Sequence, residues 1–276
     1  MAQITSFIRW AGGKSWLVPF VKELIEDLDF SGYYEPFMGG ASIFFSIDHP
    51  VKSVLSDINE DLVVTFTEIR DNPEKVIKVL QGYKADKDSY YQIRQKEPKK
   101  KHERAARFLY LNANSYNGLY RVNRSGKYNV PYGSRNVEIN IERLRNTSKK
   151  LNGVQILCQD FDAIKGEISE RDLVFLDPPY TVSKSKNGFI EYNAKLFSLE
   201  DQKRLGELID YINQIGAYFI LTNAAHDAIL DIFKEKGRLI MRERNSLIGG
   251  KASYRGKVKE YIFTNIPEKE VDNNEQ

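Results

Sequence analysis

The chain has 276 residues, of which 41% are hydrophobic and 29% charged. This size and composition fit one sizeable α/β core with a smaller attached domain, and they exclude a disordered chain. No run of about 18 apolar residues and no secretory-type N-terminus occurs, so we expect a folded cytoplasmic protein. Cys158 is the single cysteine, which excludes a disulfide framework and a cysteine-rich metal site; its apolar surroundings predict burial.

Positive charge is concentrated in one segment, although the net charge of the chain is only +3. Residues 87–150 contain 16 Lys and Arg against 5 Asp and Glu, so the rest of the chain is net negative. For residues 98–104 alone, a solvated helix face would explain the charge. Over the whole segment, with Tyr and Asn interleaved, the excess indicates a surface that follows a phosphate backbone.

The predicted elements alternate between helices and short strands. Helical periodicity predicts a helix over Lys14–Leu28, with Pro19 near its first turn, and a second amphipathic helix over Leu199–Ile215. Short apolar runs predict strands at 33–37, 53–57, 154–158, 173–177, 218–222, 238–242 and 260–264. This alternation is typical of a mostly parallel α/β sheet covered by helices on both faces.

The rhythm changes between Asn59 and Leu151. Four helix-like segments are predicted there, followed by a weak β region at 118–132 in which Gly126 is suited to a hairpin turn. We interpret 59–151 as an inserted, mainly helical domain containing a β-hairpin. The sheet domain is then discontinuous and consists of residues 1–58 and 152–266, and residues 267–276 form a flexible acidic tail.

The sequence Asp177-Pro178-Pro179-Tyr180 directly follows the apolar run 173–176. Open α/β sheets bind ligands at the carboxyl ends of their strands. The exocyclic amine of adenine is a poor nucleophile because its lone pair is delocalised, and two acceptors, the Asp177 carboxylate and the Pro178 carbonyl, would localise it. The Tyr180 ring would stack on a base taken out of the helix. The alternative is an ordinary Asp-Pro turn.

A glycine pair, Gly39-Gly40, follows the first predicted strand and lets the backbone approach a nucleoside closely. About 20 residues later Asp57 ends the next predicted strand, where an acidic residue can bind ribose hydroxyls. Gly13-Lys14-Ser15 is not a P-loop, because residue 8 is isoleucine. Lys14 is instead a candidate for binding the carboxylate of an amino-acid-like cofactor, and S-adenosylmethionine has both that carboxylate and a ribose.

In this order, the motifs resemble the Dam-type DNA adenine-N6 methyltransferases of the D12 class (alpha group). The resemblance spans residues 7 to about 263 and includes 10–14, 35–37, 57–59, 111–112, 116–121 and 129–133. It implies a Rossmann-like catalytic domain, with 59–151 as the DNA target-recognition domain. It further implies methyl transfer from S-adenosylmethionine to N6 of a flipped adenine in double-stranded DNA, within GATC, by a monomer that needs no metal.

The resemblance assigns roles to individual residues. The catalytic residues would be Asp177, Pro178, Pro179 and Tyr180. The cofactor site would be formed by Trp10, Gly12, Lys14, Glu35, Phe37, Gly39, Asp57, Ile58, Asp160, Phe161 and Asp177. DNA would be contacted by Arg9, Tyr116, Asn117, Leu119, Arg121, Asn129, Pro131 and Arg135. The fork of Arg121 suits guanine O6 and N7, and Tyr116 and Leu119 would fill the gap left by the extruded base.

Three positions depart from the family pattern. Ala41 stands where many members have a further glycine, a change that is tolerated if the backbone there does not have positive φ. Arg9 stands at a position that is often lysine, and Arg135 at one that is aromatic in some members. These differences bear on which bases the protein reads.

Two further loops are expected to take part in DNA binding or catalysis. The basic loop 245–259 either contacts DNA or is an ordinary flexible connection, and residues 183–195 would close over the target base.

The alternatives in function are an RNA adenine methyltransferase, a DNA cytosine-N4 methyltransferase and a catalytically silent DNA-binding regulator. Asp177 before Pro178 favours adenine, and the intact motifs oppose the silent regulator.

Overall fold

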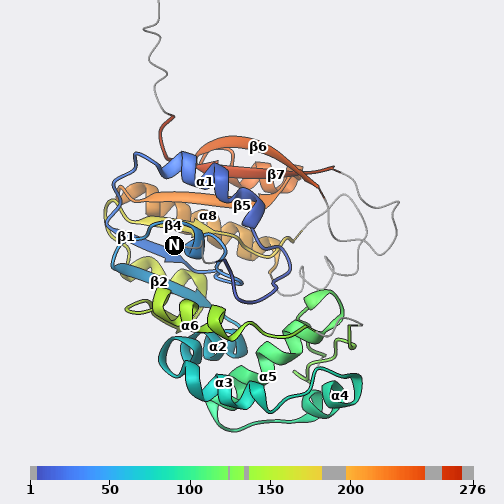
Figure 1. Cartoon of the computed structure of the whole chain (residues 1–276). Coiled ribbons are helices and arrows are strands. Elements are labelled where there is room, and N and C mark those ends of the chain that lie inside the picture. Colours follow the sequence, from blue (N-terminus) through green and yellow to red (C-terminus); the bar gives the residue numbers. More distant parts are fainter. Residues whose placement is uncertain (1–4, 124, 134–136, 182–196, 246–256, 269–276) are drawn as a thin grey trace, which may run out of the picture. The chain divides into compact units, whose positions relative to one another are not determined.

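The computed structural model describes residues 5–123, 125–133, 137–181, 197–245 and 257–268 (Figure 1). Two compact units are present: residues 1–21 with 35–161, and residues 22–34 with 162–276. Arg135, the predicted closing loop 183–195, the tail 269–276 and residues 246–256 of the basic loop lie outside the described residues. In the described part of the chain, no helix combines the length and apolar composition needed to cross a membrane.

The strands of the described residues form one sheet in the order β3-β2-β1-β4-β5-β7-β6 (Figure 1). The pairs β2–β3, β1–β4 and β4–β5 are parallel, whereas β5–β7 and β6–β7 are antiparallel. Their bounds are β1 Gly32–Glu35, β2 Lys52–Asp57, β3 Gln155–Cys158, β4 Leu173–Leu176, β5 Tyr218–Ala224, β6 Arg238–Asn245 and β7 Lys257–Thr264. The predicted mostly parallel α/β fold is confirmed, and every predicted strand is present.

In the second unit, β4 and β5 form the buried centre. All four residues of β4 are buried, as are the five inner residues of β5, because a parallel strand in mid-sheet has both faces covered. Helix α8 (Leu199–Gln214) packs on β5 and begins with a capping box between Ser198 and Asp201. The short helix α9 (Asp227–Phe233) follows β5.

The predicted N-terminal helix is shorter than its apolar pattern suggested. A 3-10 turn, η1 (Ser15–Leu17), leads into α1 (Val18–Ile25), with Pro19 in the first turn. The helix ends three residues before Leu28, whose N–H bonds to the Ile25 carbonyl. Aspartates compete with helical bonding through their side chains, and Asp27 and Asp29 follow the helix end.

The first unit contains the helices of the predicted insertion. They are α2 (Glu60–Asp71), α3 (Pro73–Gln81), α4 (Lys87–Gln95), α5 (Lys101–Asn114) and α6 (Ile141–Lys150). The described residues between 60 and 150 contain five helices rather than the predicted four. Pro73 separates α2 from α3 because a residue before proline avoids the helical region. The largely buried α5 packs against α2, α3 and α4 (Figure 1).

The weak β region at 118–132 forms bridges rather than regular strands. Antiparallel bridges join Ser115 to Tyr132 and Val122 to Tyr128. Between the second pair, Gly126 has φ +72° and donates its N–H to the carbonyl of Asn123. The turn predicted at Gly126 is therefore present, because glycine adopts this conformation without steric cost.

The predicted burial of Cys158 is wrong. This residue is exposed at the end of β3, an outermost strand of the sheet. Ile156, two residues earlier on the same face, is buried, so the exposure of Cys158 follows from its place at the end of an outermost strand. The Cys158 thiol lies 3.8 Å from the carbonyl oxygen of Ile58.

At the other end of the sheet, β6 is also an outermost strand. It is mostly exposed, including the apolar side chains of Leu239 and Met241. The same strand carries four charged residues: Arg238, Arg242, Glu243 and Arg244.

Candidate functional site

The glycine turn after β1 packs directly against an aromatic side chain. Gly39 has φ +43°, and a Cβ atom there would lie 2.7 Å from Cδ1 of Trp10. The Trp10 ring in turn stacks on Tyr120, with centroids 5.5 Å apart. Neither the backbone conformation nor the space admits a side chain at position 39, which explains why glycine stands there.

Asp57 at the end of β2 holds this turn. Its Oδ2 accepts the N–H of Gly39 at 3.2 Å, and its Oδ1 accepts the N–H of Asn59 at 2.9 Å. Burial raises the pKa of Asp57 to about 6, although the amides of Asn59, Gly39 and Ile58 oppose the rise. The arrangement presents a carboxylate with lone pairs left to accept hydroxyl groups.

A second set of predicted cofactor residues lies at the same strand ends. Because β2 and β3 are parallel, Asp57 and Cys158 are register partners, and the Gln159 N–H bonds to the Asp57 carbonyl. Asp160 is exposed, and Phe161 stacks on Phe37 with ring centroids 5.3 Å apart. Ile58 is 64% exposed, so its apolar side chain is accessible at these strand ends.

Two buried charged residues complete the predicted cofactor set. Lys14 is only 3% exposed; its Nζ donates to the carbonyl of Gly12 at 2.9 Å, and its N–H donates to Ser42 Oγ. Gly12 itself has φ +85°. Glu35 is also buried, and its Oε2 accepts the N–H of Phe44 at 3.3 Å. Both side chains are thus bonded to backbone groups of the loops that surround them.

Ala41, two residues after Gly39, stands at the position where many members of the family have a further glycine. We expect alanine to be tolerated there if the backbone does not have positive φ, and this condition is not met. Its φ is +48°, in the left-handed region. A side chain with a Cβ atom is disfavoured in this conformation, so the missing glycine leaves backbone strain in the turn.

The segment that carries Arg9 is fastened to the predicted DNA-contacting loop. The buried Asn112 accepts the Arg9 N–H at 2.9 Å through Oδ1, and its Nδ2 donates to the carbonyls of Arg9 and Gly118. The aliphatic part of the Arg9 side chain lies over Gly118, where a Cβ atom would come within 2.5 Å of Arg9 Cδ. Asn112 therefore joins two segments that are far apart in the sequence.

The remaining predicted DNA residues lie on the same loop or on the chain that returns beside it. The Tyr116 N–H donates to the Pro131 carbonyl at 2.9 Å, and the Leu119 N–H donates to the Tyr116 carbonyl. Tyr116 and Asn117 are exposed in the 3-10 turn η3 (Tyr116–Gly118), where Asn117 has φ +56°.

Arg121 is exposed and has a fixed orientation. Its Nε donates to Oδ1 of Asn129 at 2.8 Å, and the Asn129 N–H donates to the Arg121 carbonyl. This bond uses Nε alone, so the two terminal nitrogens of the exposed guanidinium are not engaged by it. Within the first unit, the structure thus brings together the seven described residues predicted to contact DNA.

In the second unit, the four-residue motif begins directly after β4. Asp177 Oδ1 accepts a hydrogen bond from Thr222 Oγ1 at 2.7 Å. Thr222 lies on β5, which pairs with β4 in parallel from Leu173↔Tyr218 to Leu176↔Leu221. The neighbouring strand therefore orients the carboxylate at the carboxyl end of β4.

The end of the motif is held by a buried polar chain. Thr181 Oγ1 donates to the carbonyl of Phe197 and accepts from Gln202 Nε2 at 3.0 Å. Gln202 Oε1 accepts from Asn223 on β5 at 2.9 Å. Between these fixed ends, Pro178 is buried and Pro179 and Tyr180 are half-buried.

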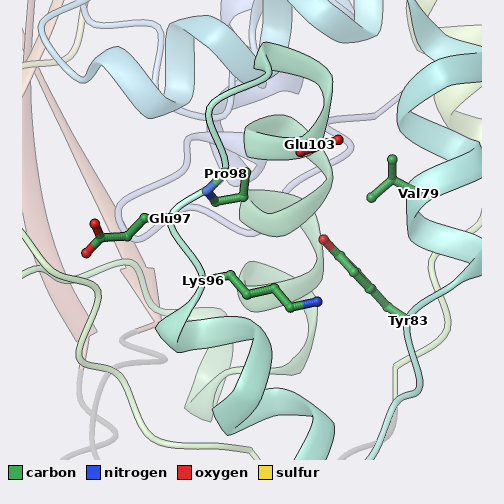
Figure 2. Close-up of a pocket in the computed structure, with 6 residues that line it drawn as sticks. All are labelled: Val79, Tyr83, Lys96, Glu97, Pro98 and Glu103. Atoms are coloured by element: carbon green, nitrogen blue, oxygen red, sulfur yellow. The ribbon is translucent and has the colours of Figure 1, made fainter.

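A surface hollow of about 450 Å³ lies elsewhere in the first unit, around the end of α3 and the connection from α4 to α5 (Figure 2). Lys96 Nζ is 5.6 Å from the centre of the Tyr83 ring, whereas Glu97 points away from that ring and pairs with Lys127 (Figure 2). No predicted site residue lines this hollow, so it is separate from the candidate site. Among the described residues, no group of three or more His, Cys, Asp or Glu is arranged to hold a metal ion.

Sequence reasoning missed the supporting residues Thr222 and Gln202 and the bonding role of Asn112. All three side chains are buried. Thr222 follows Leu221 and Asn112 follows Leu111, and since buried polar groups require partners, a polar residue within an apolar run is the signal that could have identified these two. Gln202 lies among charged residues, so this signal does not mark it.

Comparison with known proteins places this geometry in context. Residues 10–247 match the family described as D12 class N6 adenine-specific DNA methyltransferase. The chain is 32% identical over 271 residues to the type II methyltransferase M1.LlaDCHI of Lactococcus lactis subsp. cremoris, with 94% of each chain covered. It is 32% identical over 245 residues to the type II methyltransferase M.MjaIII of Methanocaldococcus jannaschii, covering 80% of this chain and 85% of the relative. It is 28% identical over 237 residues to the DNA adenine methylase of Escherichia coli strain K12, covering 83% and 84%.

Proposed function

The chain belongs to the D12 class of N6 adenine-specific DNA methyltransferases, and we propose that it transfers a methyl group from S-adenosylmethionine to a flipped adenine within GATC in duplex DNA. Membership confirms the resemblance inferred from the motifs, together with an enzyme activity on adenine in DNA. The observation that carries the proposal is the Asp177 carboxylate at the carboxyl end of β4, oriented by Thr222 and followed by two prolines and an aromatic ring.

The residues of the first unit fit the proposed cofactor. Asp57 is a carboxylate with acceptor capacity left over, suited to ribose hydroxyls. Exposed Ile58 and half-buried Phe37, which is backed by the buried Phe161, offer apolar surface to an adenine ring. Lys14 offers an ammonium group to a carboxylate, and the tight packing of Gly39 on Trp10 lets the backbone come close to a bound nucleoside.

In the proposed reaction, the bound cofactor supplies an electrophilic methyl group on its sulfonium. The chain's own residues prepare the nucleophile. The Asp177 carboxylate would accept one N6–H of the target adenine and the Pro178 carbonyl the other, which draws electron density onto N6. As the N–C bond forms, the bond between the methyl carbon and the sulfonium sulfur would break with its electron pair going to sulfur, and N6 would then lose one proton to solvent. Tyr180 stacks on the flipped base and holds its amino group in the correct plane. No metal takes part in these roles.

The residues proposed to contact DNA are of two kinds: arginines that hydrogen-bond to base edges, and an aromatic side chain that fills space. The exposed fork of Arg121 suits the O6 and N7 atoms of guanine, and Arg9 is placed on the adjoining segment by Asn112. Exposed Tyr116 supplies an apolar ring for the space left by the extruded base. GATC as the recognition site rests on the match of these positions to the Dam-type pattern.

The direct test is expression of the gene in cells that lack adenine methylation. Their DNA is then digested with one nuclease blocked by methylated GATC and another that requires it. We expect resistance to the first and cleavage by the second. The matched control is the same gene carrying Asp177→Ala, which should restore the unmethylated pattern.

Other outcomes are separated by methylation-aware sequencing of the same DNA. N6-methyladenine at another sequence would reject GATC while retaining the chemistry. N4-methylcytosine would contradict the role of Asp177 toward adenine. Unmodified DNA, together with methylated RNA or with sequence-specific binding alone, would support the RNA enzyme or the silent regulator.

A further inference from the structure

A buried carboxylate on β7 has no role in the reaction as described. Glu260 is 1% exposed, and its Oε1 accepts a hydrogen bond from Arg244 Nε on β6. The antiparallel register pairs Arg242 with Glu260 and Arg244 with Val258, so the Arg244 side chain reaches diagonally across the strand pair. A buried ion pair is costly to desolvate, so its presence requires an explanation beyond stability.

The hydroxyl group of Tyr180 is buried next to this carboxylate. Burial raises the pKa of Tyr180 well above its ordinary value, and the negative charges of Glu260 and Asp177 add to the rise against the opposing charge of Arg244. The phenol therefore stays protonated and is able to donate a hydrogen bond to Glu260. The residue as a whole is half-buried, so part of its surface remains accessible.

The register of the strands explains why this support and that of Asp177 occur together. Ala224 on β5 is the partner of Glu260, and Thr222, two residues earlier, is the partner of Ile262. Residues two apart on a strand point to the same face of a sheet. Thr222, which bonds Asp177, and Glu260, which neighbours Tyr180, therefore lie on one face.

We propose that Glu260, fixed by Arg244, is a positioning residue that sets the plane of the Tyr180 ring against the target adenine. The χ2 torsion of a tyrosine is broad, so packing at Cβ alone leaves the ring plane loosely defined. An anchored hydroxyl removes that freedom at the far end of the ring. The inference rests on the stacking role proposed above for Tyr180.

The test is a double-mutant cycle of Glu260→Gln and Tyr180→Phe, measured as kcat and KM on duplex DNA. We expect Glu260→Gln to lower kcat about tenfold in the Tyr180 background, because a loosened reacting base costs rate, and to leave the Kd of the cofactor unchanged. In the Tyr180→Phe background, where the hydroxyl is absent, Glu260→Gln should have no further effect. An equal loss in both backgrounds would overturn the proposal.

A second readout reports stacking itself. With 2-aminopurine in place of the target adenine, a flipped base is bright in solution and quenched on an aromatic ring, so Glu260→Gln should give a brighter complex than the unaltered protein. Equal brightness would also overturn the proposal. Glu207→Gln, the same change at an exposed position of α8, is the matched control and should alter neither kcat nor fluorescence.

Two further variants separate possible failures. If Glu260→Gln lowers the yield of folded protein, Arg244→Lys retains the positive charge but not the Nε donor, and its loss of kcat should likewise vanish in the Tyr180→Phe background. Tyr180→Ala tests the underlying stacking role. Full activity in Tyr180→Ala would reject that role, whereas an inactive Tyr180→Ala with an additive Glu260→Gln would reject only the inference about Glu260.

Discussion

At the scale of single residues, two aspartates at strand ends are given different chemical properties by their surroundings. Asp57 is enclosed and accepts backbone amides, and burial raises its pKa to about 6. Asp177 accepts a neutral hydroxyl from Thr222. In the proposed reaction the first binds hydroxyl groups of the cofactor and the second binds the amine that reacts, so the two can be tested separately.

The substitution Asp177→Ala should lower kcat by at least about 10²-fold, because an acceptor of the developing charge is removed from the reacting amine. Thr222→Val, which removes only the orienting hydroxyl, should cost less, about 10-fold. Single-turnover methylation of a GATC duplex measures both. Asp231→Ala on α9, an exposed position, is the control; near-normal turnover in Asp177→Ala would refute the assigned role.

The affinity for S-adenosylmethionine should fall as pH is lowered through about 6. Protonation of Asp57, whose pKa is raised to about 6, removes the carboxylate that accepts ribose hydroxyls, so binding should be roughly 10-fold weaker at pH 5 than at pH 7. Titration calorimetry at several pH values measures it. Asp57→Asn should bind weakly at pH 7 with little dependence on pH between 5 and 7.

Titration of Asp57 would not unfold the protein at low pH, so unfolding could not account for the expected loss of cofactor affinity. A carboxyl group whose pKa is higher in the folded state than in the unfolded chain binds protons preferentially when folded, so its contribution to the free energy of unfolding rises as pH falls from about 6 toward 4. A pH-independent affinity in the unaltered protein would contradict the hydroxyl-binding role.

At the scale of elements, local patterns determined most of what could be predicted. Strands such as β4 are continuous apolar runs with no competing helical periodicity, and Asp177 is found at a strand end because the run stops there. Helical periodicity did not predict the break between α2 and α3, which depends on the single residue Pro73. It also did not predict the early end of α1, which depends on the turn-forming aspartates that follow it.

The bonding partners of the residues that support the site could not be assigned from sequence, because those partners are distant along the chain. Asn112 binds Arg9, which lies 103 positions earlier, and Thr222 binds Asp177 through a strand pairing fixed only by the folded sheet. Cofactor and DNA positions were named from motifs, and the structure adds the contacts that join them within each unit.

The turn after β1 allows a stabilising substitution. Ala41→Gly should raise the free energy of unfolding by about 0.5–1 kcal/mol, because the strain of a left-handed alanine, about 1–2 kcal/mol, exceeds the added entropy of glycine in the unfolded chain. Thermal unfolding without ligand measures the change as a rise of Tm. Gly39→Ala, at φ +43° and against Trp10, should lower Tm; a lower Tm for Ala41→Gly would contradict the argument.

At the scale of the whole molecule, the basic segment 87–150 serves both folding and the proposed binding of DNA. Arg104 pairs with Glu60 and Asp61 on α2, and Arg107 donates to the carbonyls of Ile93 and Arg94. Arg121, in contrast, is exposed, and its Nε bonds to the side chain of Asn129. A count of charges along the sequence cannot distinguish these two groups.

Salt dependence should therefore reveal fewer phosphate contacts than the charge count suggests. If all 16 basic residues neutralised phosphates, the slope of log K against log salt concentration would be about −14; we expect a clearly shallower slope. Fluorescence anisotropy of labelled duplexes measures this slope.

Arg121→Ala should reduce discrimination between GATC and altered sites by about 1–3 kcal/mol, whereas Arg104→Ala should lower Tm and leave discrimination unchanged.

A slope near −14, or loss of discrimination in Arg104→Ala, would contradict the distinction between basic residues that stabilise the fold and those that contact DNA.

The same measurements bear on the proposed insertion at 59–151, which is our interpretation of the domain boundaries. The helices α2–α6 and the loop with Arg121 belong to one compact unit, together with β2, β3 and the residues proposed for the cofactor.

The outermost strand β6 has a consequence for the behaviour of the protein in concentrated solution. An edge strand with exposed apolar side chains such as Leu239 and Met241 is a template on which another chain can add a strand and begin aggregation. The closely spaced charges of Arg238, Arg242, Glu243 and Arg244 would oppose such addition by repulsion and by the cost of removing water from them. Efforts to engineer this protein for expression or crystallisation should accordingly preserve the charges on β6 and make changes elsewhere.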